Sequence, residues 1–175
     1  MYKAEDIAKF QSHQQAVKSV SNDPYENTPF WAYRIMSSRK KGAAFEKLTK
    51  EFFKNQFGLD SHKSLSSDHD TIVQGRKLEI KGSMMWVNGR GVCTHFRWQQ
   101  IRLSQDYDAM IFMAMYPQGI RWLWASKQDL IDNLDPKKYN QHGGKSVDSG
   151  TMAIDGIPET FPWMKEITNA DFVKS

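Results

Sequence analysis

Apolar residues recur at helical spacing in two stretches of the first third of the chain. Residues 5–20 show this spacing loosely, and residues 42–57 show it clearly, with Gly58 directly after the last apolar position. Glycine commonly ends a helix because it adopts left-handed backbone angles without strain. We therefore predict two helices, the second of which places Glu46 at the edge of its apolar stripe. Glu46 can serve a site from there, or it can pair with Lys50 one turn later as an ordinary solvated residue.

The second half of the chain alternates between strand patterns and less regular segments. Residues 109–116 form an almost continuous apolar run, typical of a central strand that is covered on both faces. Residues 120–125 predict a further strand, and residues 126–134 begin with a capping box and predict a helix. Residues 135–159 are polar and rich in glycine and predict a long loop, and the segment from residue 161 onward predicts a terminal packing strand or helix. The order strand, strand, helix indicates a mixed α/β core.

Between these two parts lies a predicted β-hairpin. Residues 71–73 and 78–80 are short β-branched and aliphatic runs, and the glycine at position 75 suits a tight turn. A two-residue loop at 74–75 would place Asp70 directly opposite Glu79 on the neighbouring strand. A turn centred on residue 75 alone would send these two carboxylates to opposite faces, and the sequence leaves both registers open.

In the first register, three charged side chains of the hairpin share one face. Glu79 and Lys81 lie on the same side of their strand because side chains alternate, and Asp70 faces them. Two neighbouring carboxylates repel each other unless a cation lies between them, and Mg2+ takes one or two carboxylates together with water and phosphate oxygens. A nearby ammonium group can stabilise the charge on an attacked phosphate. The hairpin therefore predicts a magnesium site, and an edge hairpin with three solvated charges is the alternative.

The same residues resemble the motif of the PD-(D/E)XK nuclease superfamily, to which many restriction endonucleases belong. In this motif an Asp is followed, after a short gap, by an apolar strand that ends Glu-x-Lys, and Asp70, Glu79 and Lys81 match those positions. Members also tend to carry an acidic residue on a helix just upstream, which Glu46 matches. The residue before Asp70 is His69 rather than the proline of the motif, a frequent departure that does not touch the chemistry.

The resemblance covers residues 40 to about 125 and implies both a fold and a site. The implied fold is α/β, in the wider sense α+β, with a restriction-endonuclease-like central mixed β-sheet flanked by helices. The implied catalytic residues are Asp70, Glu79, Lys81 and Glu46. Asp70 and Glu79 would hold Mg2+, for which Mn2+ is expected to substitute. Lys81 would assist the nucleophile, and Glu46 would act through a water bound to the metal.

Three basic or amide-rich stretches are candidates for contact with DNA. After the hairpin, an Asn-Gly turn at 88–89 is expected to return the chain to residues 95–102, where Arg and Gln alternate with aromatic residues. Such side chains can make bidentate contacts with base edges or phosphates, and the family often has a helix with a polar residue at this place. The three stretches are residues 39–41, 95–102 and 141–145. Their alternatives are, in the same order, a solvated basic face, ordinary packing and a plain loop. The candidate residues are Lys40, Lys41, Arg97, Gln99, Gln100, Arg102, His142 and Lys145.

Composition narrows the class of protein. The 175 residues are 39% hydrophobic and 13% aromatic, which fits one folded domain. A net charge of +4 and a pI near 9.1 permit nucleic-acid binding without requiring it. The single cysteine, Cys93, excludes a disulfide framework and a cysteine-rich zinc site, and no signal peptide or membrane-spanning run is found, so we expect a cytoplasmic protein. No Walker-type phosphate loop is present, which argues against an NTP-driven enzyme.

Together these observations predict a single nuclease domain over residues 1–175 that hydrolyses phosphodiester bonds of double-stranded DNA with Mg2+. The small size and the absence of a separate recognition domain favour a type II restriction endonuclease that cuts at a defined sequence. A homing endonuclease of a mobile element would use the same residues, and a structure-specific resolvase or repair nuclease would prefer junctions or mismatches. A catalytically inactive DNA-binding module is the alternative from another class. We also expect a homodimer on DNA, because a two-fold pair of sites can address both strands of a symmetric target.

Overall fold

The computed structural model describes residues 23–140 and 151–174, so the helix predicted for residues 5–20 lies outside the described residues. The described α-helices are α2 (Trp31–Arg34), α3 (Ser38–Phe57), α4 (Lys127–Asn133) and α5 (Pro136–Tyr139). Two short 3-10 helices are η2 (Pro158–Thr160) and η3 (Ala170–Val173). The strands are β1 (Ser61–Lys63), β2 (Thr71–Val73), β3 (Arg76–Met84), β4 (Phe96–Ile101), β5 (Ala109–Tyr116), β6 (Gly119–Ser126), β7 (Met152–Gly156) and β8 (Lys165–Glu166).

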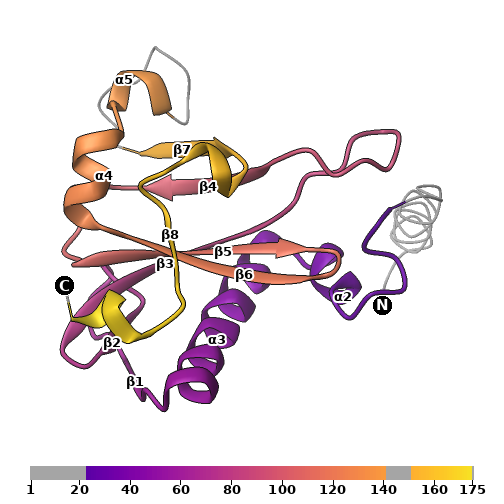
Figure 1. Ribbon diagram of the computed structural model, residues 1–175. Coiled ribbons are helices and arrows are strands. Elements are labelled where there is room, and N and C mark those ends of the chain that lie inside the picture. The colour runs from indigo at the N-terminus through magenta and orange to yellow at the C-terminus, as the bar shows by residue number, and fades with distance from the viewer. Residues whose placement is uncertain (1–22, 141–150, 175) are drawn as a thin grey trace, which may run out of the picture.

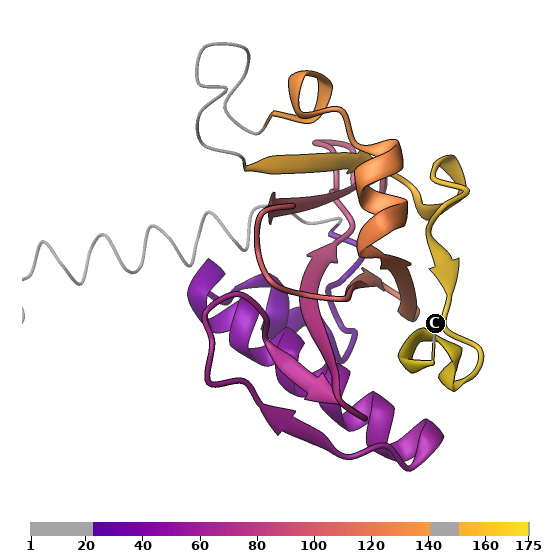
Figure 2. The same cartoon turned by 90° about the vertical axis from the view of Figure 1, so that its left-hand side faces the viewer.

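Six of these strands form one mixed sheet in the order β1-β2-β3-β5-β6-β8, and β4 pairs with β7 in a separate two-stranded ribbon. β3 and β5 are parallel, whereas the other pairs of the large sheet are antiparallel. α3 packs on one face of the large sheet, and the β4-β7 ribbon lies over the opposite face (Figure 1 and Figure 2). The fold is therefore α+β, with a central mixed sheet flanked by helices, as the sequence predicted.

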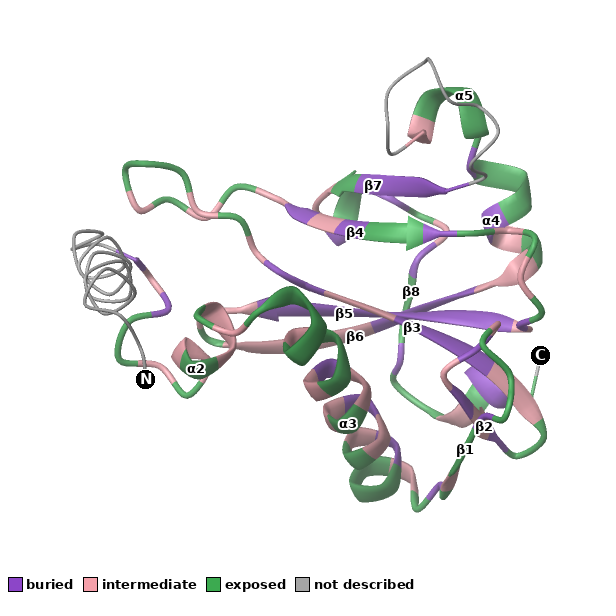
Figure 3. Ribbon diagram, turned by 180° about the vertical axis from the view of Figure 1, so that it is seen from behind, coloured by how far each residue is buried: buried purple, intermediate pink, exposed green. Residues whose placement is uncertain are grey.

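β5 lies in the interior of the sheet, and its side chains serve both faces. Met110 and Phe112 pack in the cluster that contains the apolar residues of β4, and Ala109 and Ile111 pack in the cluster beneath α3. All residues from 109 to 115 are buried, which confirms the central strand predicted from the continuous apolar run (Figure 3). β3 is the parallel neighbour of β5, so it also lies between α3 and the β4-β7 ribbon.

α3 approaches β3 closely because one residue of the strand has no side chain. The helix begins at Ser38, earlier than the apolar pattern indicated, and ends as predicted at Gly58, whose φ is 65° and whose N–H donates to Lys54 O at 3.0 Å. Near its start, Phe45 lies on Gly82 of β3, where a Cβ would come within 2.1 Å of the Phe45 ring. The glycine therefore sets the distance between the helix and the strand that carries the predicted site.

Two segments differ from the sequence predictions. The resemblance pointed to a helix after the Glu-x-Lys strand, but the segment forms strand β4. The prediction of a loop over 135–159 is wrong at Met152–Gly156, which form β7, and α5 lies in the same stretch. The two strands pair with each other, with Trp98 opposite Ile154, and both of these side chains are fully buried. Each strand depends on a distant partner, so its local pattern did not reveal it.

The remaining predicted elements are confirmed. β6 covers the strand predicted for 120–125, and α4 begins with a capping box in which Ser126 and Asp129 each accept the other's backbone N–H at 3.0 Å. The segment after residue 161 forms both a short strand, β8, and a 3-10 helix, η3. Across residues 23–140 and 151–174, no helix is both long enough and apolar enough to cross a membrane.

Candidate active site

The hairpin forms with the two-residue loop of the first predicted register. Thr71 pairs with Leu78, and the loop residues Gln74 and Gly75 have positive φ angles of 49° and 83°. Two such residues make the hairpin turn whose twist matches that of the flanking strands. The alternative register, centred on Gly75 alone, is excluded.

Asp70 lies just before β2 and occupies the edge of β3 that β2 leaves open. β2 covers β3 only as far as Leu78. Beyond that point, the backbone N–H of Ile80 donates a 2.7 Å hydrogen bond to Asp70 Oδ2. The N–H of Asp70 donates to Leu78 O at 3.0 Å. The carboxylate of Asp70 therefore replaces a missing strand partner, which fixes it beside the Glu-x-Lys segment.

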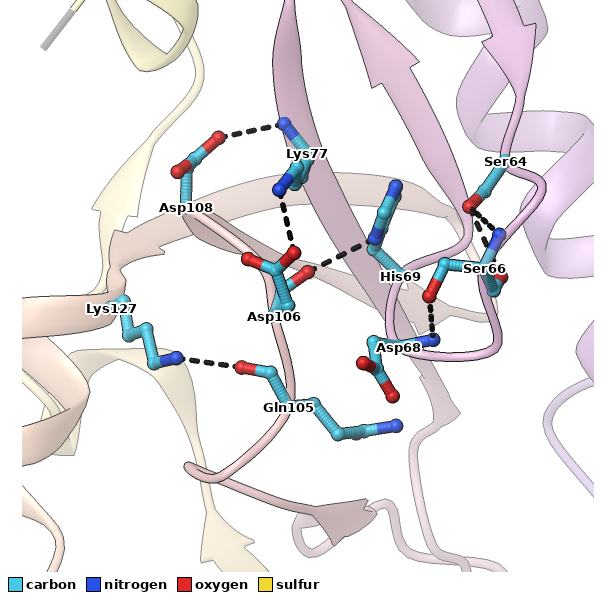
Figure 4. A network of polar contacts seen from close by, with 9 residues as sticks. All are labelled: Ser64, Ser66, Asp68, His69, Lys77, Gln105, Asp106, Asp108 and Lys127. Atoms are coloured by element: carbon cyan, nitrogen blue, oxygen red, sulfur yellow. Dashed lines mark hydrogen bonds and ion pairs between the residues drawn. The ribbon is translucent and has the colours of Figure 1, made fainter.

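A network of polar contacts that includes His69, the residue before Asp70, holds the start of the hairpin in place (Figure 4). His69 is buried, and its Nδ1 lies 3.0 Å from the carbonyl oxygen of Asp106, so this nitrogen donates. Lys77 Nζ donates to the Asp106 carboxylate at 2.6 Å, and the Lys77 backbone N–H donates to Asp108 at 2.8 Å. These bonds tie the connection between β4 and β5 to the hairpin. Sequence patterns did not reveal them, because the partners lie 29 to 37 residues apart.

Glu79 and Lys81 project from β3 away from α3. Leu78 and Ile80 pack in the cluster beneath α3, so the alternating residues point to the opposite side. Glu79 is only 5% exposed, and its Oε1 accepts a 2.6 Å hydrogen bond from Lys81 Nζ. Burial raises the pKa of Glu79 to about 7, although Lys81 lowers it, and Asp70 raises it further. Near neutral pH this carboxyl is balanced between its protonated and charged forms, and a bound cation would favour the charged form.

Glu46 projects from α3 into the cavity that Asp70, Glu79 and Lys81 also line. Burial raises the pKa of Glu46, and Asp70 raises it further, whereas Lys50 and Lys81 lower it. Asp70 and Lys81 must therefore lie close enough to the Glu46 carboxylate to act on its charge. Glu46 is not a solvated helix residue that pairs with Lys50 alone, because it shares a cavity with residues of the hairpin.

The four predicted catalytic residues line one open cavity of about 600 Å³. Its walls come from α3, from β3, and from β4 with the connection that follows it. The predicted DNA contacts that line the cavity are Lys41, Arg97, Gln99, Gln100 and Arg102. Lys40 is exposed on α3 and does not contribute to the lining. His142 and Lys145 lie outside the described residues.

Several polar or aromatic residues of the lining were not predicted. They include Arg34, Ser83, Trp86 and Gln105. In the sequence, Trp86 continues an apolar strand and resembles a core residue, but it is 53% exposed and stacks on His95 with 5.7 Å between ring centroids. Burial lowers the pKa of Lys41, and nearby Arg34 lowers it further. Arg34 Nε already donates to Asp23 Oδ2 at 2.9 Å, so Lys41 is the cation of this pair that can hold an anion such as a phosphate.

The donor set fits a magnesium ion that is held by few protein ligands. Among residues 23–140 and 151–174, no group of three or more His, Cys, Asp or Glu side chains is placed to hold a metal ion. Asp70 nevertheless lies near enough to Glu79 to raise the pKa of the Glu79 carboxyl. Mg2+ commonly takes one or two carboxylates and completes its shell with water and substrate phosphate oxygens. The pair suits Mg2+ better than zinc, whose sites use nitrogen and sulfur ligands.

Models of known protein families and the curated proteins give no match to this chain. The likeness to the PD-(D/E)XK nucleases is therefore a likeness of motif and residue order. Any assignment of function depends on the geometry and chemistry of the cavity.

Proposed function

We propose that this protein is a Mg2+-dependent endonuclease that hydrolyses phosphodiester bonds of double-stranded DNA. The observation that carries the proposal is that Asp70, Glu79, Lys81 and Glu46 share one cavity with a wall of basic and amide side chains. Carboxylates alone would repel a phosphodiester, and basic residues alone would only bind it. Their combination suits a site in which a metal ion and a phosphate meet.

Each residue has a role that its surroundings support. Asp70 and Glu79 would hold the magnesium ion, which supplies Lewis-acid stabilisation of the charge on the attacked phosphate. Lys81 Nζ, 2.6 Å from Glu79, favours the charged form of that carboxylate and can stabilise negative charge on the phosphate. A carboxylate with a raised pKa accepts protons more readily, so Glu46 is suited to bind and orient a water in the cavity. Lys41 would position the DNA backbone.

The burial of Glu79 favours an enzyme over a DNA-binding module. The charged form of a carboxyl that is 5% exposed is costly unless a partner stabilises it. A module that only binds DNA gains nothing from such a group, because carboxylates repel phosphates. A metal site does gain, since the ion would add to Lys81 in stabilising the charged form that burial disfavours.

A cleavage assay tests the proposal. The purified protein is incubated with assorted duplex DNA and Mg2+, and the ends of the products are mapped. We expect discrete ends with Mg2+ or Mn2+ and no cleavage with EDTA, and Asp70→Asn, Glu79→Gln and Lys81→Ala should abolish cleavage. Glu51→Gln is the matched control, because Glu51 is an exposed carboxylate of α3 outside the cavity lining. Normal cleavage by the Asp70 and Glu79 variants would show that the site is elsewhere.

DNA binding without metal separates the role of the carboxylates in holding Mg2+ from their repulsion of the phosphate. In the absence of Mg2+, each carboxylate repels a bound phosphate by about 1–4 kcal/mol per close pair, depending on the local dielectric. Glu79→Gln should therefore bind duplex DNA as tightly as the unmodified protein, or more tightly. Lys81→Ala should bind slightly less tightly because it loses a positive charge. Gel-shift titrations at one salt concentration measure both effects, and a large loss of affinity in Glu79→Gln would contradict the arrangement.

Within this class, we favour a sequence-specific enzyme of the type II restriction kind. A homing endonuclease would use the same residues, so the genes nearby separate the two. An adjacent methyltransferase gene favours restriction, and an intron or phage setting favours homing. Branched or mismatched duplexes in the same assay would identify a structure-specific nuclease, which should cut them in preference to linear DNA.

A further inference from the structure

β4 contains a β-bulge at Gln99 and Gln100, within the wall of the cavity. Between Trp98 and Ile101 the register with β7 shifts, so β4 holds one more residue than its partner over this stretch. The φ of Gln100 is 58°, in the left-handed region. Trp98 and Ile101 are fully buried, and Trp98 Nε1 donates to the Met113 carbonyl at 3.2 Å. The buried side chains of Trp98 and Ile101 thus fix the strand on both sides of the bulge.

The bulge brings two neighbouring side chains into the same cavity. Successive residues of a regular strand point to opposite faces, but Gln99 and Gln100 are both exposed and both line the cavity. Glycine is the residue that adopts left-handed angles without strain, so a glutamine at position 100 costs conformational energy. Such strain concentrates at functional sites, where the side chain has a use that offsets it.

The chemistry of this wall distinguishes the glutamines from the arginines beside them. Arg97 Nε lies 3.6 Å from Asp155 Oδ1, beyond hydrogen-bond length, and Arg102 Nε donates to Thr151 Oγ1 at 3.4 Å. A guanidinium group offers donors only. An amide group offers one acceptor and two donors on a single plane. This pattern matches the major-groove edge of adenine, where N6 donates and N7 accepts.

We infer that Gln99 and Gln100 determine sequence specificity, and that the preferred substrate is duplex DNA with adenine in the recognised sequence. The amide oxygen accepts from adenine N6, and the amide nitrogen donates to N7. The inference rests on the proposed nuclease function and adds a base preference to it. Loss of the two amides should lower the cleavage of adenine-containing sequences toward that of other sequences, so the change appears in the ratio of the two rates.

Cleavage of a randomised duplex library by the full-length protein tests the inference. With Mg2+ at one salt concentration, sequencing of the product ends should show adenine enriched at fixed positions relative to the cut. Gln100→Gly removes the amide and relieves the backbone, so the variant should fold, and its cleavage of adenine-containing sequences relative to other sequences should fall by roughly 5- to 150-fold. Gln74→Gly is the matched control, because Gln74 is also left-handed, at φ 49°, but lies in the hairpin turn outside the cavity lining. Its adenine preference should be unchanged.

A second measurement uses a preferred duplex in which 7-deazaadenine replaces adenine and removes the N7 acceptor. The unmodified protein should cut this duplex more slowly, and the double variant Gln99→Ala/Gln100→Gly should cut both duplexes at similar rates. Cleavage by the unmodified protein without adenine preference would overturn the inference and leave the nuclease function intact. Variants at both positions that keep the adenine preference would also overturn the inference and leave the nuclease function intact. A protein that cuts no DNA would overturn the proposed function, and the inference with it.

Discussion

Glu79 is a buried carboxyl beside both a cation and a second carboxylate, and this setting predicts a pH dependence of metal binding. Its pKa of about 7 means that a proton increasingly occupies the carboxyl as the pH falls below neutrality. Mg2+ requires the charged form, so the affinity for Mg2+ should be about tenfold weaker at pH 6 than at pH 8. Calorimetric titration with MgCl2 at the two pH values measures the change. Equal affinities would contradict the proposed role of Glu79.

His69 stabilises the hairpin through one partly buried hydrogen bond. His69→Ala leaves the Asp106 carbonyl without this donor, which should lower the free energy of unfolding by about 1–3 kcal/mol. Cleavage should slow as well, because the adjacent Asp70 is held less firmly. Urea denaturation measures the loss, with His62→Ala as the control, since His62 is exposed on β1 and should change stability by less than about 0.5 kcal/mol. Equal effects of the two substitutions would rule out this role for His69.

The central part of the site was predictable because it depends on local rules. The alternation of side chains and one of the two possible turns predict that Asp70, Glu79 and Lys81 converge, and the structure decides between the two turns in favour of 74–75. The contacts and surroundings that hold these residues in place were not predictable. His69 finds its partner across a long connection, and the exposure of Trp86 depends on where the neighbouring elements lie.

At the scale of elements, the contact between α3 and β3 should tolerate no side chain at position 82. Gly82→Ala would place a Cβ 2.1 Å from the Phe45 ring, so the helix or the ring must move, at a cost of about 1–3 kcal/mol in the free energy of unfolding. Phe45→Leu should recover part of that loss in the double variant, which chemical denaturation can measure. Gly89→Ala is the control, because nothing lies within 4 Å of a Cβ there. Additive effects at Gly82 and Phe45 would contradict the direct contact.

Elements with their own periodicity were predicted, and elements that depend on a distant partner were not. The continuous apolar run of β5 and the glycine after α3 are strong local signals. The start of α3 lacks such a signal, because residues 39–41 are all basic. The apolar run of β7 is short, and it becomes a strand only by pairing with β4.

At the scale of the whole molecule, the proposed hydrolysis takes place on one strand per cavity, so a cut through both strands would require two copies. We expect two chains of 20.3 kDa on one symmetric target duplex. Sedimentation of the Glu79→Gln variant with such a duplex measures the stoichiometry without cleavage. In parallel, the unmodified protein should convert supercoiled plasmid to the linear form. One chain per duplex together with nicked circles as the final product would contradict the homodimer.

The pairing of β4 with β7 also sets the order in which the cavity is completed during synthesis. The hairpin and α3 precede β4 in the chain, whereas the strand that fixes the glutamine wall begins only at residue 152. At about 5–20 residues per second, the stretch between the two strands takes a ribosome roughly 3 to 10 s to translate. During that interval the growing polypeptide has Asp70, Glu79 and β4 but not the partner strand of β4, so the cavity wall at Gln99 and Gln100 is completed only after β7 has been made.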